Sequence, residues 1–380
     1  MDIILQPKTL HGTVAAPPSK SIAHRMLIFA AFADEPTKLI CPEISDDIDA
    51  TAHCLRALGA NIQRTDSGYR ILPIHRIPES ADLYCRESGS TLRFLLPIVG
   101  ALGVSATFHM EGRLSQRPLS PLLEEMERMG CTLSHPTADT IRCQGKLRPG
   151  AYKIDGSVSS QFVSGLLMAL PLIEGETALE ITGRLESKPY VEMTRHVLSL
   201  FEQGAPDQRS VEGDWSNGAF WLAANALGSD LTVTNLDNAS VQGDRAIREI
   251  LPFLRYHTTI GAADIPDLVP ILSVVAAANK GAVFVDIARL RLKESDRVTS
   301  IIAMLESLGG KAEATENTLT VYGTGLTGGI VDSCSDHRIA MSAAIAATVC
   351  AEPVTILGAE CVRKSYPRFW EEYHRLSFGR

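Results

Sequence analysis

The chain has 380 residues, of which 45% are hydrophobic and 21% are charged, and its formal net charge is −8. This composition excludes an intrinsically disordered protein and, at roughly 100–200 residues per domain, predicts about two domains. The negative charge also excludes a protein that coats nucleic acid or an anionic membrane through bulk electrostatics. An anionic ligand would therefore need a local cationic pocket.

The hydrophobic segments are too short to cross a membrane, which takes roughly 18 uninterrupted apolar residues. Met26–Ala33 and Leu268–Ala278 are typical of them. Residues Met1–Lys20 lack the pattern of a secretory leader, so we expect a cytoplasmic protein. The eight cysteines are scattered without Cys-x-x-Cys or Cys/His zinc spacing, and we interpret them as buried free thiols rather than metal ligands.

A repeat organises the chain, because six apolar segments each follow a polar cluster. We predict buried helices over Arg25–Ala33, Leu92–Leu102, Phe162–Leu172, Ala219–Leu227, Leu268–Ala278 and Ile339–Val349. Their polar anchors are Ser19, Ser88, Ser157, Asp214, Asp267 and Asp336. Three of the five anchor intervals are 69 residues, and the third and fourth are only 57 and 53. Equal spacing of this kind indicates an internal repeat.

Each apolar helix is followed by a second, amphipathic one. These are expected around Asp47–Leu58, Pro121–Met129, Val191–Phe201, Arg245–Leu254, Arg297–Leu308 and Pro367–Leu376. Gly59, Gly130 and Gly309 then introduce alternating stretches that predict strand hairpins. The intervals after Gly204 and Leu254 have lost the room for a hairpin.

The six units are expected to pack as two domains of three units, with sheets outside and apolar helices inside, because one unit cannot bury both its faces. The first domain would be residues 14–213, and residues 1–13 with 214–380 would form the second. We expect the ligand in a cleft between the domains.

Polar residues at two helix starts are candidates for anion binding. Ser19-Lys20-Ser21 places hydroxyls and an ammonium beside helix N–H groups, and Arg25 lies one turn further on the same face. Ser157-Val158-Ser159-Ser160-Gln161 offers more hydroxyls than one cap needs. The alternative in both cases is an ordinary capped helix.

Three charged runs in the second half of the chain are further candidates. Glu294 lies between cations in Lys293-Glu294-Ser295-Asp296-Arg297 and could carry a proton, although such a run can also be a solvated turn. In Asp336-His337-Arg338 the histidine fits a structural role and Arg338 is the better ligand candidate. Arg363-Lys364 could close a cationic pocket or remain solvated. Cations at successive helix starts indicate two small anionic substrates.

Eight ordered motifs resemble the enolpyruvyl transferase family over nearly the whole chain, and most closely its branch that uses shikimate 3-phosphate. They are Pro18-Ser19-Lys20-Ser21-Ile22-Ala23-His24-Arg25, Gly89-Ser90-Thr91-Leu92-Arg93, Gln116-Arg117-Pro118-Leu119, Asp155-Gly156-Ser157-Val158-Ser159-Ser160-Gln161-Phe162, Ser187-Lys188-Pro189-Tyr190, Ile265-Pro266-Asp267, Lys293-Glu294-Ser295-Asp296-Arg297 and Asp336-His337-Arg338.

The resemblance implies an α/β (α+β) fold, a two-domain inverse α/β barrel of six repeated helix/sheet units. It also implies a reaction in the shikimate pathway to chorismate and aromatic amino acids. The 5-hydroxyl of shikimate 3-phosphate attacks phosphoenolpyruvate, and the tetrahedral intermediate eliminates inorganic phosphate. The family needs no metal or organic cofactor, and we expect a monomer whose partners are these small-molecule substrates.

The resemblance also assigns roles to individual residues. Lys20, Asp267 and Glu294 would be catalytic, with Asp267 and Glu294 handling protons. Shikimate 3-phosphate would be bound by Ser21, Arg25, Ser159, Ser160, Gln161, Ser187, Tyr190, Asp267 and Lys293. Phosphoenolpyruvate would be bound by Lys20, Gly89, Arg117, Gln161, Arg297, Arg338 and Lys364.

The chain departs from the family pattern in three places. Glu87 stands where many relatives carry Asn, and Arg289 stands where some have an Asn that contacts substrate. The short intervals drop strand segments that relatives have in the fourth and fifth units. These losses spare every motif, so we interpret the chain as a compact active enzyme.

Two alternatives remain. The sister branch uses UDP-N-acetylglucosamine and usually carries a reactive Cys five residues before the Arg-Pro pair, where this chain has Gly112 before Arg117-Pro118. That difference, and Ser-Lys-Ser in the first motif, favour shikimate 3-phosphate. The second alternative is a non-catalytic paralogue that kept its anion sites, against which the intact Lys20, Asp267 and Glu294 count.

Overall fold

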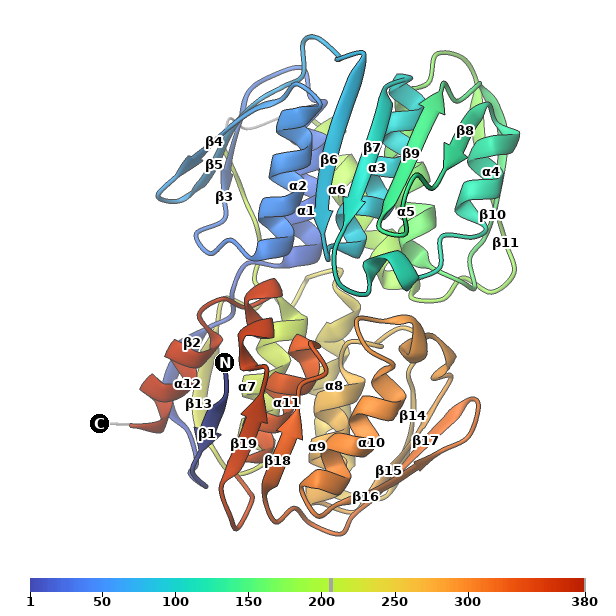
Figure 1. Ribbon diagram of the computed structural model, residues 1–380. Coiled ribbons are helices and arrows are strands. Elements are labelled where there is room, and N and C mark those ends of the chain that lie inside the picture. The colour runs from blue at the N-terminus through green and yellow to red at the C-terminus, as the bar shows by residue number, and fades with distance from the viewer. Residues whose placement is uncertain (205–207, 379–380) are drawn as a thin grey trace. The chain divides into compact units, whose positions relative to one another are not determined.

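The computed structural model describes residues 1–204 and 208–378, which form two compact units (Figure 1). The central unit is Pro18–Val211, and the terminal unit combines Met1–Pro17 with Glu212–Arg380. We propose that these units are the two domains, which the repeat predicted as residues 14–213 and as residues 1–13 with 214–380. Val211 marks the division structurally because its N–H still bonds to Ile40 in the central unit.

The helices of the central unit alternate between apolar and amphipathic, as the repeat predicts. The apolar ones are α1 (Lys20–Ala31), α3 (Gly89–Leu102) and α5 (Ser160–Ala169), the last extended by a 3-10 turn, η2 (Leu170–Leu172). The amphipathic ones are α2 (Asp46–Ala57), α4 (Leu122–Arg128) and α6 (Lys188–Glu202). Helix α3 packs on α5, and α1 packs on α2 and α6, so the apolar helices form the core.

Three small sheets complete the central unit. The first has the order β12-β3-β5-β4, the second β6-β7-β9-β8, and the third only β10-β11. Their strands are β3 (Thr37–Ile40), β4 (Asn61–Thr65), β5 (Gly68–Leu72), β6 (Ser80–Arg86), β7 (Ser105–Met110), β8 (Cys131–Ser134), β9 (Thr140–Gly145), β10 (Gly150–Asp155), β11 (Thr177–Thr182) and β12 (Gln208–Ser210).

The terminal unit repeats the same design. Its apolar helices are α7 (Trp215–Ala226), α9 (Val269–Ala278) and α11 (His337–Ala346), and α9 packs against both others. Its remaining helices include α10 (Arg297–Ser307) and α12 (Phe369–Ser377). The sheets have the orders β14-β15-β17-β16, β1-β19-β18 and β13-β2.

The strands of the terminal unit come from both ends of the chain, because β1 and β2 pair with strands more than 200 residues away. They are β1 (Ile3–Leu5), β2 (His11–Ala15), β13 (Asp230–Thr234), β14 (Thr258–Gly261), β15 (Ala282–Val285), β16 (Lys311–Ala314), β17 (Thr318–Tyr322), β18 (Gly329–Asp332) and β19 (Val354–Leu357).

The expected amphipathic helix over Arg245–Leu254 is broken. The segment is a 3-10 turn η3 (Gly243–Ala246), a single α-turn α8 (Ile247–Ile250) and a second 3-10 turn η4 (Leu251–Arg255). Pro252 lies in η4 and cannot donate the backbone hydrogen bond that would continue α8. Within the described ranges, no helix is both long and apolar enough to span a membrane.

Two sheets of the described residues have only two strands, β10-β11 beside α5 and β13-β2 beside α7. Where a hairpin is present, its second strand pairs with the strand that follows the apolar helix of the same unit, as β5 pairs with β3 and β17 with β15. Among the described residues no hairpin follows α6 or α8, and the sheets β10-β11 and β13-β2 have two strands each. That this chain has lost strand segments which relatives carry in the fourth and fifth units stays a prediction.

Four of the six polar anchors cap their helices. Ser19, Ser88, Asp214 and Asp336 accept hydrogen bonds from backbone N–H groups in the first turn. For α5 the cap is Ser159 rather than Ser157. The N-cap residue of α9 is Leu268, whose side chain cannot cap the helix, and the carboxylate of the preceding Asp267 contacts cations, as described below.

Candidate active site

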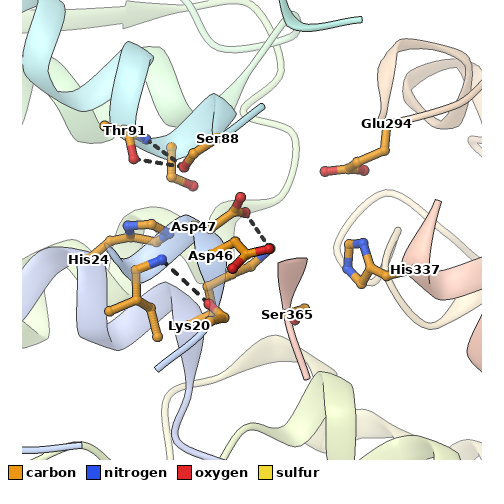
Figure 2. A network of polar contacts seen from close by, with 12 residues as sticks. Lys20, His24, Asp46, Asp47, Ser88, Thr91, Glu294, His337 and Ser365 are labelled. Atoms are coloured by element: carbon orange, nitrogen blue, oxygen red, sulfur yellow. Dashed lines mark hydrogen bonds and ion pairs between the residues drawn. The ribbon is translucent and has the colours of Figure 1, made fainter. Parts of the chain in front are cut away.

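An ion pair lies at the start of α1 in the central unit. Lys20 Nζ is 2.9 Å from Asp47 Oδ2, and their side chains are 14% and 9% exposed (Figure 2). Lys20 is the first residue of α1, and Asp47 lies in the first turn of α2, so the pair joins two helix N-termini. Sequence reasoning selected Lys20 but missed Asp47, since an acidic residue in a first helical turn is ordinary.

The N-terminus of α3 is surrounded by arginine and glutamine side chains. A Cβ built on Gly89 would lie 2.6 Å from Arg93 Nη1 and 2.8 Å from Arg117 Nη1, so both guanidinium groups lie against this glycine. Gln161 accepts a hydrogen bond from Arg93 Nη1 at 3.2 Å and donates to Ser90 Oγ at 3.0 Å. The structure therefore brings Gly89, Arg117 and Gln161 together, with Arg93 as the link.

Arg25 is buried among neutral acceptors. Its guanidinium donates to the carbonyls of Ser21 at 2.7 Å and Tyr190 at 2.8 Å, and to the hydroxyl of Thr194 at 2.8 Å. Within the described chain, no carboxylate pairs with it. Burial lowers the pKa of Arg25 to about 9. A buried cation without a counter-ion favours an anionic ligand nearby, while its contacts tie α1 to α6.

The serines predicted to bind shikimate 3-phosphate occupy helix N-termini. Ser159 caps α5 and Ser160 is its first residue. Ser187 precedes α6 in a left-handed conformation, with φ of 53°, and is buried. This conformation is strained for a residue other than glycine, so the surrounding structure must hold Ser187 in place.

In the terminal unit one guanidinium binds three carboxylates. Arg297 is only 1% exposed. Its Nη1 lies 2.6 Å from Asp267 Oδ1, its Nη2 lies 2.7 Å from Glu294 Oε2, and its Nε lies 2.9 Å from Asp336 Oδ2. Because Nη1 and Nη2 belong to one planar group, Asp267 and Glu294 are held side by side. Asp336, seen in the sequence only as part of a helix start, is the third partner.

The pKa of Asp267 is strongly perturbed. Burial alone would raise its pKa, but Lys293, Arg297 and Arg338 outweigh burial and hold the pKa of Asp267 well below its usual range. Lys293 Nζ is 3.4 Å and Arg338 Nη2 is 3.7 Å from the carboxylate. Asp267 is therefore ionised at neutral pH and can accept a proton or a hydrogen bond, but cannot donate one.

The cations around Asp267 are themselves buried. Burial lowers the pKa of Lys293 to about 8, and the charge of Asp267 opposes that shift. Arg338 Nε and Nη1 have no hydrogen-bond partner within residues 1–204 and 208–378. Lys364 is also buried, at the end of the 3-10 turn η6 (Ala359–Lys364). Unused donors on a buried guanidinium are suited to an anionic ligand.

Asp244 is a further buried acidic residue that the sequence did not indicate. Asp244 in η3 accepts a hydrogen bond from the Ser216 hydroxyl. Burial, with the charge of Asp267, raises the pKa of Asp244 to about 7. Nothing in the local sequence distinguishes it from a surface aspartate, because its burial depends on α7.

The predicted site residues thus form two groups. The central unit provides cations and hydroxyls at the starts of α1, α3, α5 and α6, which suits the binding of phosphate and carboxylate groups. The terminal unit provides two adjacent carboxylates among buried cations, which suits proton transfer. The predicted cleft between domains stays a prediction.

The chain is similar to known proteins over nearly its full length. The family model described as EPSP synthase (3-phosphoshikimate 1-carboxyvinyltransferase) matches residues 4–373. The 3-phosphoshikimate 1-carboxyvinyltransferase of Clostridium kluyveri is 37% identical over 98% of this chain and 97% of that protein. The protein of the same name from Clostridium acetobutylicum is 38% identical, with 98% and 96% covered.

The first of these alignments spans 412 positions, more than the 380 residues of this chain, as expected if hairpins have been deleted. An EPSP synthase structure from Acinetobacter baumannii superposes with a TM-score of 0.78, at 23% identity and with 99% of this chain and 98% of that chain covered. This similarity confirms the two-domain inverse α/β fold expected from the motifs. The chain therefore belongs to the EPSP synthase family.

Proposed function

We propose that this protein transfers the enolpyruvyl group of phosphoenolpyruvate to the 5-hydroxyl of shikimate 3-phosphate, releasing inorganic phosphate. The proposal is supported by its family and by the names of its relatives. The observation that carries the mechanism is the pairing of Asp267 and Glu294 on the single guanidinium of Arg297.

The central unit supplies most of the substrate contacts in this proposal. Arg25, with Ser21, Ser159, Ser160, Ser187 and Tyr190, holds shikimate 3-phosphate, and Gln161 contributes to both substrates. Lys20, Gly89 and Arg117 hold phosphoenolpyruvate. Arg25 suits this role because it is a buried cation with only neutral protein partners. Binding two anions side by side requires such fixed positive charge, since each substrate repels the other.

The terminal unit handles the protons. Addition removes a proton from the 5-hydroxyl and places one on the methylene carbon of phosphoenolpyruvate, and elimination reverses the second transfer. In this proposal Asp267, which is ionised, accepts the proton of the 5-hydroxyl. Glu294 transfers the proton to and from the methylene carbon. Lys293, Arg297, Arg338 and Lys364 stabilise the negative charge of the substrates and of the departing phosphate.

Gly112 argues against UDP-N-acetylglucosamine as the acceptor. A Cβ built at this position would overlap the carboxylate of Glu87, and the backbone φ of 54° also favours glycine. A reactive cysteine at this position would require the Glu87 carboxylate to move and a residue with a side chain to adopt this strained backbone conformation. Glu87, the departure from the family pattern, fills the space that the cysteine side chain would need.

Phosphate release by the purified protein tests the proposal. Phosphoenolpyruvate is supplied with shikimate 3-phosphate, or separately with UDP-N-acetylglucosamine, and the product is identified by mass. We expect phosphate and the enolpyruvyl product only with shikimate 3-phosphate. Release only with the sugar nucleotide would move the assignment to the sister branch, and release with neither would favour the non-catalytic paralogue.

Substitution of Glu294 tests the proton-transfer pair. We expect Glu294→Gln to lower kcat by about 10²–10⁴-fold, the usual contribution of a general acid–base group, while phosphoenolpyruvate still binds. Glu306→Gln is the matched control, because Glu306 is an exposed residue of α10. Undiminished turnover in Glu294→Gln would remove this residue from the mechanism.

We also propose that the enzyme is a cytoplasmic monomer. All eight cysteines are free thiols, and seven of them are at least partly buried, which fits a reducing compartment. Size-exclusion chromatography with light scattering tests the monomer, for which a mass near 41.1 kDa is expected.

A further inference from the structure

A buried chain of hydrogen bonds joins the first three helices of the central unit. His24 Nδ1 lies 2.7 Å from Thr51 Oγ1, which lies 2.7 Å from Thr91 Oγ1. Thr91 Oγ1 in turn donates to Ser88 Oγ at 2.7 Å (Figure 2). All four residues are fully buried, and they come from α1, α2, α3 and the cap of α3.

The direction of donation follows from the last bond. A hydroxyl has one proton, and that of Thr91 is given to Ser88, so Thr51 must donate to Thr91. The proton of Thr51 is then used as well, and His24 Nδ1 must donate to Thr51. The chain therefore requires the tautomer of His24 that carries its proton on Nδ1.

His24 stays neutral in this position. Its Nε2 is buried and has no hydrogen-bond partner among the residues that the structure describes, so a second ring proton would have no acceptor there. Burial lowers the pKa of His24 to about 3, with Lys20 and Arg25 lowering it and Asp47 opposing them. The imidazole ring is nearly perpendicular to the ring of Phe94, with an interplanar angle of 83°. His24 is thus a permanent N–H donor rather than a carrier of protons.

The chain of hydrogen bonds runs beside the candidate phosphoenolpyruvate residues. His24 lies one helical turn after Lys20, and Thr51 lies one turn after Asp47, so the imidazole contact and the ion pair tie α1 to α2 at successive turns. At the other end, Ser88 caps α3 immediately before Gly89. The guanidinium groups of Arg93 and Arg117 leave no free space at Gly89. A small shift of the N-terminus of α3 would therefore displace these guanidinium groups.

We propose that His24 is a positioning residue for phosphoenolpyruvate, which orients the N-termini of α1 and α3 through its hydrogen bond to Thr51. The inference rests on the proposed function. His24 contacts no substrate in this account and acts through Lys20 and Gly89.

Ser21 and Arg25 on α1 are also assigned to shikimate 3-phosphate, but Arg25 is held on α6 by the Tyr190 carbonyl and the Thr194 hydroxyl. The other assigned residues of the central unit lie at the starts of α5 and α6, outside the chain of hydrogen bonds. We therefore expect the binding of shikimate 3-phosphate to change much less than that of phosphoenolpyruvate.

Steady-state kinetics of two variants test the positioning role. His24→Leu removes the donor, and we expect KM for phosphoenolpyruvate to rise about tenfold while KM for shikimate 3-phosphate stays within about twofold. His24→Asn keeps an N–H close to the place of Nδ1, so it should recover most of the lost affinity. His53→Leu is the control, since His53 is exposed on α2. Equal rises in both KM values, or an Asn variant no better than Leu, would overturn the proposal.

Thr51→Val interrupts the same chain with a nearly isosteric side chain and keeps the test open if His24→Leu does not fold. We expect Thr51→Val to raise KM for phosphoenolpyruvate about as much as His24→Leu does. The double variant should have a KM no higher than that of the more impaired single variant, because both substitutions break the same chain of hydrogen bonds. Additive effects would contradict a shared path.

The tautomer is tested without substrate. Nitrogen-15 NMR of the imidazole in the full-length protein should show a protonated Nδ1 and a bare Nε2 from pH 5 to 8, whether or not the enzyme uses shikimate 3-phosphate. A protonated Nε2 would refute the hydrogen-bond direction even in an active enzyme. A wild type inactive with shikimate 3-phosphate would instead refute the proposed function, and with it the role in positioning.

Discussion

Replacing Arg297 should destabilise the terminal unit severely. The guanidinium is 1% exposed and binds Asp267, Glu294 and Asp336, which are 17%, 14% and 0% exposed. After Arg297→Met, Asp267 keeps Lys293 and Arg338, and Asp336 keeps the Ser295 hydroxyl and the backbone N–H of Arg338 as donors. Leaving a buried charge without its partner costs about 3–5 kcal/mol, so we expect a loss of that size in the free energy of unfolding.

The loss should depend on pH in a definite direction. Arg297 helps to hold the pKa of Asp267 down in the folded protein, so removing the cation moves the folded-state pKa toward the unfolded value. A carboxyl whose folded-state pKa is depressed contributes stability above its unfolded pKa of about 3.9, and this contribution is lost as pH falls through the folded-state pKa. The deficit of Arg297→Met relative to wild type should therefore be fully present at pH 7.5 and should shrink as pH falls below about 4.

Urea unfolding followed by tryptophan fluorescence measures this deficit directly. All three tryptophans, Trp215, Trp221 and Trp370, belong to the terminal unit, so their emission reports on the unit that contains Arg297. Arg291→Met is the control, because Arg291 is 35% exposed and lies 3.5 Å from Asp296. We expect it to change stability by at most about 1 kcal/mol. An equally small effect for Arg297→Met, or a deficit that grows toward acid pH, would refute the electrostatic reasoning.

Two further predictions concern a buried carboxyl and a glycine. The pKa of Asp244 is raised to about 7 in the folded protein, so the wild type should lose stability as pH rises from about 4 to 7, by up to roughly 4 kcal/mol. The free energy of unfolding of Asp244→Asn should therefore rise relative to that of the wild type as pH increases, as measured by urea unfolding at pH 5 to 8. A pH-independent difference between the two proteins would contradict this. Gly89→Ala should raise KM for phosphoenolpyruvate about tenfold, because its methyl group displaces Arg93 and Arg117. Gly261→Ala, where a Cβ meets open space, should leave KM unchanged, and the reasoning fails if the two variants behave alike.

Local chemistry made much of the fold predictable. The caps at Ser19, Ser88, Asp214 and Asp336 lie where the sequence placed them, since capping depends only on a side chain and the next backbone turn. Asp267 was predicted as the polar anchor of a helix, but its side chain does not cap α9. Its carboxylate is used by Arg297, Lys293 and Arg338, and these come from elements up to 71 residues away.

The pairing of the strands was less predictable than their existence. The sequence predicted strand hairpins after three amphipathic helices, but chain order does not say that a hairpin returns to the strand before its own amphipathic helix, as β5 returns to β3. The helix expected over Arg245–Leu254 failed at Pro252, where local backbone chemistry prevails over the hydrophobic period.

The sequence alone determined the six-unit repeat, the apolar helices and most residues of the candidate site, because periodicity, capping and motif order are local properties. Only the tertiary structure decided which charges are buried and which groups share them. It placed Asp47 on Lys20, gathered Asp267, Glu294 and Asp336 around Arg297, and isolated His24 from water. A pKa or an ion pair depends on burial and on neighbours distant in the chain, and these arise only when helices pack.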